Sequence, residues 1–206
     1  MPFSVVTVTA PNEVQQALIG QMPAFLSGSQ PSPTLVFVGP APKIPTAAEV
    51  GLMIQRPVAQ RMFGLSLVDA ARAGSVPEEH GWRFILGNSP GSTVMARVSR
   101  RAQAWKVAAV HYGGRPWDTY SALLELPSNP QIPDGAYEVR ALGVAGLNLE
   151  AFWLASKTAD LEDLVVPLLP LPGQLTGKDF YTLPEYLATI RPMAQAMLNM
   201  SPGHGA

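Results

Sequence analysis

The segment HYGGRPWDTY, which starts at His111, is the densest group of polar and aromatic side chains in the sequence. It joins an imidazole that titrates near neutral pH to a guanidinium and a carboxylate, and two adjacent glycines make its backbone flexible. Loops after strand ends often carry binding groups, so these side chains could line a pocket for a small ligand. The ligand-binding residues that we predict here are His111, Tyr112, Arg115, Trp117 and Asp118.

A structural role also accounts for this segment. Asp118 would lie near the N-terminus of the following helix, where a carboxylate is favourable, and Trp117 would fill the core. Most loops connect elements without doing chemistry, so we favour the structural interpretation. The alternative is an enzyme or small-ligand binder with Lys106 nearby, and it requires His111 and Asp118 to lie together in one concave site. No reaction class follows from these residue types.

A second candidate group consists of Glu150, Trp153 and Lys157. Residues three and four apart share one face of a helix, so these side chains would be neighbours if the segment LNLEAFWLAS is helical. Ordinary decoration of a helix surface explains the spacing equally well. The same segment also suits a second strand, in which case the spacing has no meaning.

The residue types exclude several kinds of chemistry. The chain contains no cysteine and three histidines, and neither His-x-x-x-His nor His-Glu-x-x-His spacing occurs. Thiolate catalysis and cysteine-based metal sites are therefore excluded, and we predict no metal site and no cofactor. The sequence also lacks the glycine patterns of a hydrolase nucleophile elbow, a phosphate-binding Walker loop and a dinucleotide-binding turn.

Composition limits the partners that the protein can have. Of the 206 residues, 47% are hydrophobic and 14% are charged, and the formal net charge is -1. The charged fraction is below the roughly 25% typical of soluble domains, so much of the surface must be neutral or apolar. With no basic block, we predict no nucleic-acid binding. The N-terminus does not resemble a signal peptide and no apolar run reaches ~20 residues, so we expect a soluble, cytoplasmic protein without a transmembrane segment.

Hydrophobic periodicity predicts alternating strands and helices. A hairpin or meander is expected in the middle of the chain, although its Ala-rich second half also fits a helix. We expect the first helix to be interrupted at Gly20 and Pro23, and we expect Pro116 in the first turn of another helix. The predicted strands begin near residues 3, 35, 81, 92, 104, 137 and 164, and the predicted helices cover residues 12–22, 46–63, 65–74, 116–126 and 182–198.

Two segments of the sequence resemble each other. RPVAQRMF starts at Arg56 and RPMAQAML starts at Arg191, and five of the eight aligned residues are identical. Each follows an apolar strand-like run, a proline-rich loop and the spacing of a capping box, Thr46 with Glu49 and Thr182 with Glu185. A proline inside a helix costs about 3 kcal/mol, so we predict that both helices are kinked.

These parallels suggest an internal duplication, in which units 1–75 and 137–200 flank a central hairpin and helix at 76–136. The alternative is that amphipathic helices rich in alanine and methionine resemble each other by composition alone. Duplication requires the two segments to have the same secondary structure. An arginine at each bend could bind a ligand, but we favour arginines that cover the bend and contact solvent.

Taken together, the sequence predicts a single α+β domain at residues 1–200 with a flexible tail at 201–206. Its sheet is expected to be mixed or largely antiparallel, with amphipathic helices packed on it. High apolar content without a catalytic signature favours a non-catalytic module that binds a protein partner or a second copy of itself.

Overall fold

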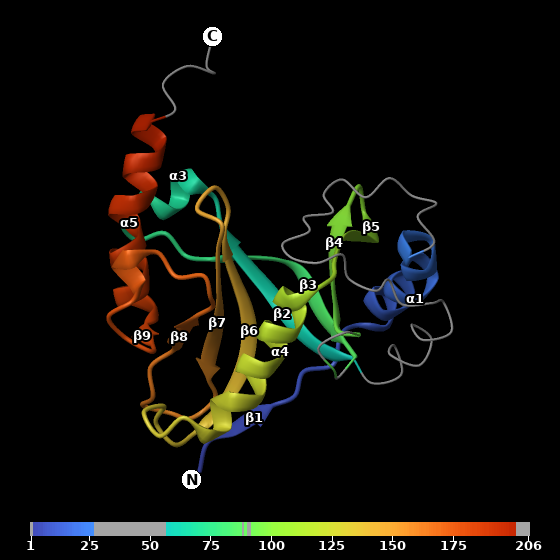
Figure 1. Cartoon of the computed structure of the whole chain (residues 1–206), viewed down its shortest axis with the longest axis horizontal. Coiled ribbons are helices and arrows are strands. Elements are labelled where there is room, and N and C mark those ends of the chain that lie inside the picture. Colours follow the sequence, from blue (N-terminus) through green and yellow to red (C-terminus); the bar gives the residue numbers. More distant parts are fainter. Residues whose placement is uncertain (1, 27–56, 88, 90–91, 201–206) are drawn as a thin grey trace. The chain divides into compact units, whose positions relative to one another are not determined.

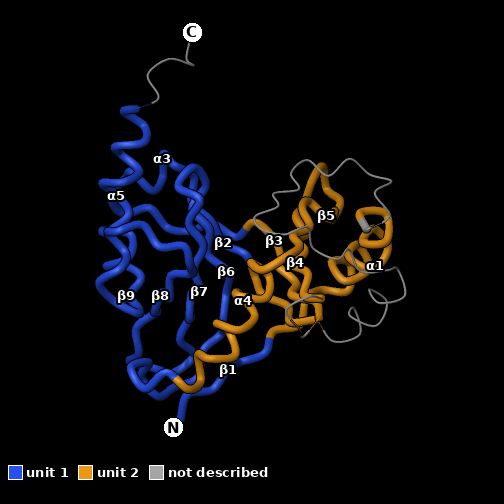
Figure 2. The backbone as a smooth tube through the Cα atoms, in the orientation of Figure 1, with its two compact units in different colours: residues 1–7, 62–79, 129–206 blue, residues 8–61, 80–128 orange. Residues whose placement is uncertain are grey.

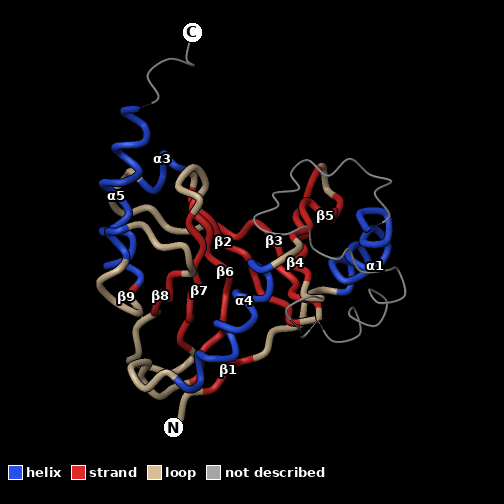
Figure 3. Tube along the Cα trace, in the orientation of Figure 1, coloured by secondary structure: helices blue, strands red, loops and turns tan. Residues whose placement is uncertain are grey.

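The computed structural model describes residues 2–26, 57–87, 89 and 92–200, and within them the fold is α+β (Figures 1 and 3). The strands are β1 (Ser4–Val6), β2 (Val58–Leu65), β3 (Glu78–Leu86), β4 (Val94–Arg101), β5 (Ala104–His111), β6 (Ala136–Val144), β7 (Leu149–Ser156), β8 (Leu164–Pro167) and β9 (Tyr181–Thr182). The helices in this part are α1 (Asn12–Leu26), α3 (Leu67–Ala70), α4 (Gly114–Glu125) and α5 (Leu183–Met200), with 3-10 turns at Leu126–Ser128 and Gly173–Leu175.

The nine strands are hydrogen-bonded into one mixed sheet, as predicted. Their order is β5-β4-β3-β2-β6-β7-β8-β9, and β1 also pairs with β6. Both β1 and β2 run parallel to β6, whereas β3-β4-β5 and β6-β7-β8-β9 are antiparallel runs. Short connections between consecutive strands explain the antiparallel runs, because parallel neighbours need a longer crossover.

The chain divides into two compact units (Figure 2). Unit 1 contains residues 1–7, 62–79 and 129–206, and unit 2 contains residues 8–61 and 80–128. The first half of β2 thus belongs to unit 2 and the second half to unit 1. The units interleave along the sequence, and the single domain predicted for residues 1–200 stays a prediction.

In unit 1, α3 and α5 pack on one face of the sheet. Side chains on a strand alternate between faces, so β7 directs Ala151, Trp153 and Ala155 toward the helices. From α5, Tyr186 and Ile190 complete this core, and both are fully buried. The residues that build unit 1's sheet therefore also fix the position of α5.

Helix α5 begins with the predicted capping box. The Thr182 backbone N–H donates to Glu185 Oε2 at 3.0 Å, and the Glu185 N–H donates to Thr182 Oγ1 at 3.3 Å. Helical structure continues through Pro192 to Met200. Because Pro192 is exposed and the stripe beside it is buried, packing of α5 on the sheet offsets the lost backbone bond.

In unit 2, α1 packs against β3, β4 and β5. Its buried residues Val14, Leu18 and Met22 follow helical spacing and join the strand residues in a second core. The helix runs through Gly20 and Pro23, so the predicted interruption is wrong. Both residues are exposed, and the buried stripe on the other side keeps the helix continuous.

The central hairpin is the best predicted part of the fold. Strands β4 and β5 are antiparallel, and Arg101 pairs with Ala104 across a two-residue turn. In this turn Ala102 has φ 47° and Gln103 has φ 68°. Two positive φ values give the turn a twist that matches the strands, although neither residue is the glycine or asparagine usual at these positions.

The helix predicted for residues 46–63 is wrong where the structure describes it. Residues 46–56 lie outside the described part, as does the strand predicted from residue 35, and Val58–Leu65 is strand β2. Sheet pairing on its β6 side overrides the helical propensity of this segment. Because Arg191–Leu198 is helical instead, the two similar segments differ in secondary structure, and the duplication is not supported.

Among the described residues, no helix is both long enough and apolar enough to cross a membrane.

Candidate functional site

The predicted segment at His111 is a strand-to-helix connection. His111 is the last residue of β5, Tyr112 and Gly113 form the link, and α4 begins at Gly114. Gly113 has φ 93°, a conformation that glycine adopts without strain. Pro116 is in the first turn of α4, as predicted. The backbone here forms the strand-to-helix connection that the structural interpretation requires.

The side chains of the five predicted residues do not all share the same surroundings. Tyr112 packs against the core between α1 and the hairpin, next to Val110. His111 pairs in register with Met95 of β4, which is not among the residues of that core. Tyr112 packs against this core and His111 is not among its residues, so the imidazole and the phenol have different surroundings.

Tyr112 is unsuited to acid–base chemistry at neutral pH. Its hydroxyl is buried, and it has no hydrogen-bond partner in the described part of the chain. Burial raises the pKa of Tyr112 to about 12, because the charged phenolate is poorly solvated there. Asp118 is exposed, and the Trp117 ring lies 5.9 Å from the Tyr120 ring on the same helix. The ligand site at these residues stays a prediction.

The second candidate group is not a helix face. Glu150 and Trp153 lie on strand β7, and Lys157 follows its end. Their odd and even positions place Glu150 and Trp153 on opposite faces of the sheet. Trp153 belongs to the core under α5, while Lys157 is exposed and contacts a different carboxylate.

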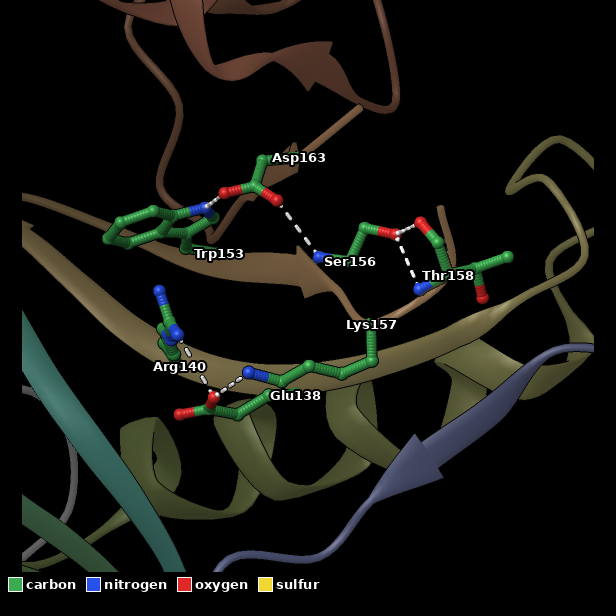
Figure 4. A network of polar contacts seen from close by, with 7 residues as sticks. All are labelled: Glu138, Arg140, Trp153, Ser156, Lys157, Thr158 and Asp163. Atoms are coloured by element: carbon green, nitrogen blue, oxygen red, sulfur yellow. Dashed lines mark hydrogen bonds and ion pairs between the residues drawn. The ribbon is translucent and has the colours of Figure 1, made fainter. Parts of the chain in front are cut away.

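That carboxylate is Glu138, the centre of a polar network in unit 1 (Figure 4). Glu138 is only 2% exposed, and its Oε2 is 3.0 Å from Arg140 Nη2 and 2.7 Å from Lys157 Nζ. Glu138 and Arg140 are two residues apart on β6, so both side chains project from the same face. The two cations offset the cost of burying the carboxylate.

Arg140 lies between two aromatic rings. Its guanidinium carbon is 5.0 Å from the centre of the Phe63 ring and 4.7 Å from that of Trp153. Trp153 is directly opposite Arg140 in the β6-β7 register, and Phe63 comes from β2. A guanidinium over an aromatic face is attracted by the ring's negative face. These contacts fix the orientation of Arg140.

Asp163 completes the network from the loop before β8. Its Oδ2 accepts a hydrogen bond from Trp153 Nε1 at 2.8 Å, and its Oδ1 accepts one from the Ser156 backbone N–H at 2.9 Å. The Ser156 hydroxyl donates in turn to the Thr158 carbonyl at 2.9 Å (Figure 4). The network thus joins β6, β7 and the turn between β7 and β8.

The network is suited to holding the sheet together rather than to chemistry. Glu138 and Asp163 contribute two negative charges, and Arg140 and Lys157 contribute two positive charges. Glu138 is paired with both cations, and Asp163 accepts two hydrogen bonds, so both carboxylates make contacts that link neighbouring elements of unit 1. In the described part of the chain, no three acidic or histidine side chains are grouped so that they could hold a metal ion.

Sequence reasoning missed Glu138, Arg140 and Asp163. The signal available was weak: Glu138 and Arg140 are charged residues at alternate positions of a strand whose other residues are mostly apolar. Such residues are rarely buried unless they are paired. The pairing with Trp153 and Asp163 depends on strand register, which the sequence pattern does not specify.

A separate feature of unit 1 is the exposed C-terminal part of α5, residues 195–200, which we call the α5 end. Ala194 is fully buried, but residues 195–200 are all exposed. Met197 is 42% exposed, Leu198 36% and Met200 78%. The helix therefore carries large apolar side chains beyond the part that packs on the sheet.

Comparisons with protein-family models, with curated proteins and with solved structures found no match to this chain.

Proposed function

We propose that the protein is a non-catalytic assembly module, and that two copies associate weakly through the α5 end. The observation that supports this is the continuation of the apolar stripe of α5 past the core. Tyr186, Ile190 and Ala194 are buried at intervals of four residues, and the next positions on that stripe are Met197 and Leu198. A stripe that continues into solvent favours a second apolar surface.

The charge pattern favours a second copy as the occupant. From Pro192 to the end of the chain the sequence contains no Asp, Glu, Lys or Arg. Two identical surfaces can therefore meet without like-charge repulsion, which is the main obstacle to self-association of charged surfaces. A two-fold interface would pair each α5 end with its copy in antiparallel orientation.

The size of the surface limits the affinity. The six residues of the α5 end span about 9 Å at ~1.5 Å per residue, whereas each partner in a standard interface contributes roughly 20–30 residues and about 800 Å². Methionine adapts its shape to a partner without specifying it closely. We therefore expect a weak dimer that forms only at high concentration.

The test is sedimentation equilibrium over concentrations from about 10 µM to about 1 mM. Wild-type protein should shift from monomer toward dimer, and the double variant Met197→Lys/Leu198→Lys should remain monomeric. The matched control is Leu169→Lys, because Leu169 is 76% exposed in the same unit but lies in the loop after β8 and not on α5. A wild-type protein that stays monomeric throughout, or a double variant that dimerises normally, contradicts the proposal.

A further inference from the structure

Unit 1 contains a surface pocket of about 330 Å³ between α3, the segment that follows it and the first half of α5. In Figure 1, α3 lies beside α5, and the two helices contact each other. Leu65 and Ala70 line the pocket from β2 and α3, and both are buried. Leu183 and Leu187 line it from α5. The pocket volume is within the range of small-molecule sites, and its walls are mainly apolar.

Arg191 gives this pocket a polar end. It is four residues after Leu187, so it lies on the same face of α5 as the two leucines, and it lines the pocket. Arg191 is half-buried, and its Nε is buried without a hydrogen-bond partner among the described residues. An unsatisfied buried donor on a cationic group is costly, and an anionic acceptor would remove that cost.

The other charged groups of the pocket favour an anion. Arg72 also lines it and pairs with Asp69 at 4.0 Å, between side chains that are 69% and 49% exposed. Such a long, exposed pair holds Arg72 weakly. Asp69 also accepts a hydrogen bond from the Ser66 hydroxyl at the start of α3. The two arginines and one aspartate that line the pocket leave it with a net positive charge.

We propose that this pocket binds a small carboxylate with an apolar tail. The carboxylate pairs with Arg191 and Arg72, and the tail lies between Leu183 and Leu187 on α5 and Leu65 below them. The pocket is at the lower end of the size range of small-molecule sites, which suits an eight-carbon alkyl acid or a phenyl-substituted short acid. The site is separate from the α5 end, so it does not depend on self-association.

The test titrates the full chain with octanoate, octan-1-ol and octylammonium, followed by calorimetry and by amide NMR shifts. Octanoate should bind about tenfold or more tightly than the alcohol of the same length, because only the acid can form charge-assisted hydrogen bonds with the arginines. Octylammonium should bind least. If the alcohol or the amine binds as well as the acid, or if octanoate does not bind, the proposal is overturned without any variant.

Variants then locate the site. Arg191→Gln should abolish the preference for octanoate over octanol, while Arg191→Lys should keep part of it. The matched control is Arg100→Gln, an exposed arginine in unit 2, which should leave both affinities unchanged. Leu187→Trp should fill the pocket and abolish binding of both compounds. Circular dichroism checks that each variant is folded, and retention of the octanoate preference in Arg191→Gln refutes the assignment.

Two further experiments define the tail of the ligand and show whether octanoate binding is independent of self-association. Comparing octanoate with 3-phenylpropionate shows whether the tail is alkyl or aryl. The double variant Met197→Lys/Leu198→Lys should bind octanoate normally, and Arg191→Gln should sediment like the wild-type protein. Loss of octanoate binding in the double variant would contradict the separate pocket.

Discussion

Helix α5 has two parts, a longer one at residues 183–194 and a shorter one at residues 195–200, which we call its first and second halves. Both are rich in apolar residues, but their surroundings differ. In the first half, Tyr186, Ile190 and Ala194 are fully buried against the sheet of unit 1. In the second half, residues 195–200 are all exposed, although Met197 and Leu198 continue the same stripe. The capping box at Thr182 supports only the first half.

This difference shows that an amphipathic stripe does not by itself identify its partner. The first half buries its apolar stripe against the sheet of the same unit, so packing as well as the cap stabilises its helical structure. The second half continues the helix with its apolar side chains in water. Its Gln195 Nε2 donates to the carbonyl of Ala71, the residue that follows α3, at 3.1 Å.

Truncating one apolar residue in each half of α5 tests most directly whether only the first half is packed in the monomer. Ile190→Ala should lower the free energy of unfolding by about 2–5 kcal/mol, because it leaves a cavity under a fully buried residue. Met197→Ala should change it by less than about 0.5 kcal/mol at low protein concentration, where no dimer forms. Urea unfolding followed by circular dichroism measures both. Equal losses would show that the second half is also packed in the monomer.

Removing the cap tests the first half at its start. Thr182→Ala should cost about 1 kcal/mol, because the Glu185 N–H loses its acceptor. Thr189→Ala is the matched control. The Thr189 hydroxyl donates to the Glu185 carbonyl inside the helix, so it does not serve as an acceptor for an unpaired backbone N–H at the helix start. The control should be neutral or slightly stabilising. If both variants lose the same amount in urea titrations, the capping box does not stabilise α5.

The buried face of the first half also contains a polar atom whose removal should help. The Tyr186 hydroxyl is buried without a hydrogen-bond partner among the described residues, and burial raises its pKa far above the ordinary value. Tyr186→Phe should raise the unfolding free energy by up to about 1 kcal/mol. In Tyr137 the hydroxyl donates to the Pro133 carbonyl at 3.2 Å, so Tyr137→Phe should lower it by a similar amount. Thermal denaturation of the two variants should therefore shift in opposite directions.

Much of the fold follows from local sequence, and α5 illustrates why. Its start is encoded by the spacing of Thr182 and Glu185, so the capping box was predicted correctly. The apolar spacing continues to Leu198, however, and does not show that burial ends at Ala194. The hairpin at residues 94–111 was predicted for a similar reason, because its strands alternate. In these elements the local pattern and the tertiary environment agree.

The failures come from elements whose surroundings decide their structure. Val58–Leu65 has a helix-like composition that closely matches part of α5, yet it pairs with β6 as a strand. The network around Arg140 needs Phe63, Trp153 and Asp163 from separate elements, and only strand register brings them together. The pocket at Arg191 likewise depends on how α3 packs on α5. The sequence pattern alone could have suggested that Arg191 shares a face with Leu187, but not that the face borders a cavity.

The smallest expected effect is the dependence of the first half on pH. Hydrogen bonding from the Thr182 backbone, and then from Lys178, holds the pKa of Glu185 below its ordinary value of 4.5. A carboxylate whose pKa is lower in the folded state contributes stability above its unfolded pKa, and this contribution is lost as the pH falls through the folded pKa. The wild-type protein should therefore lose part of its stability below about pH 4.5, whereas Glu185→Gln should lack this component. The difference in urea midpoint between the wild-type protein and Glu185→Gln should stay constant from pH 7 down to about pH 4.5, and should shrink at lower pH. Because Glu185 is exposed, the effect should weaken further in high salt, and a difference that is constant down to pH 3 would show that the carboxylate is not part of the cap.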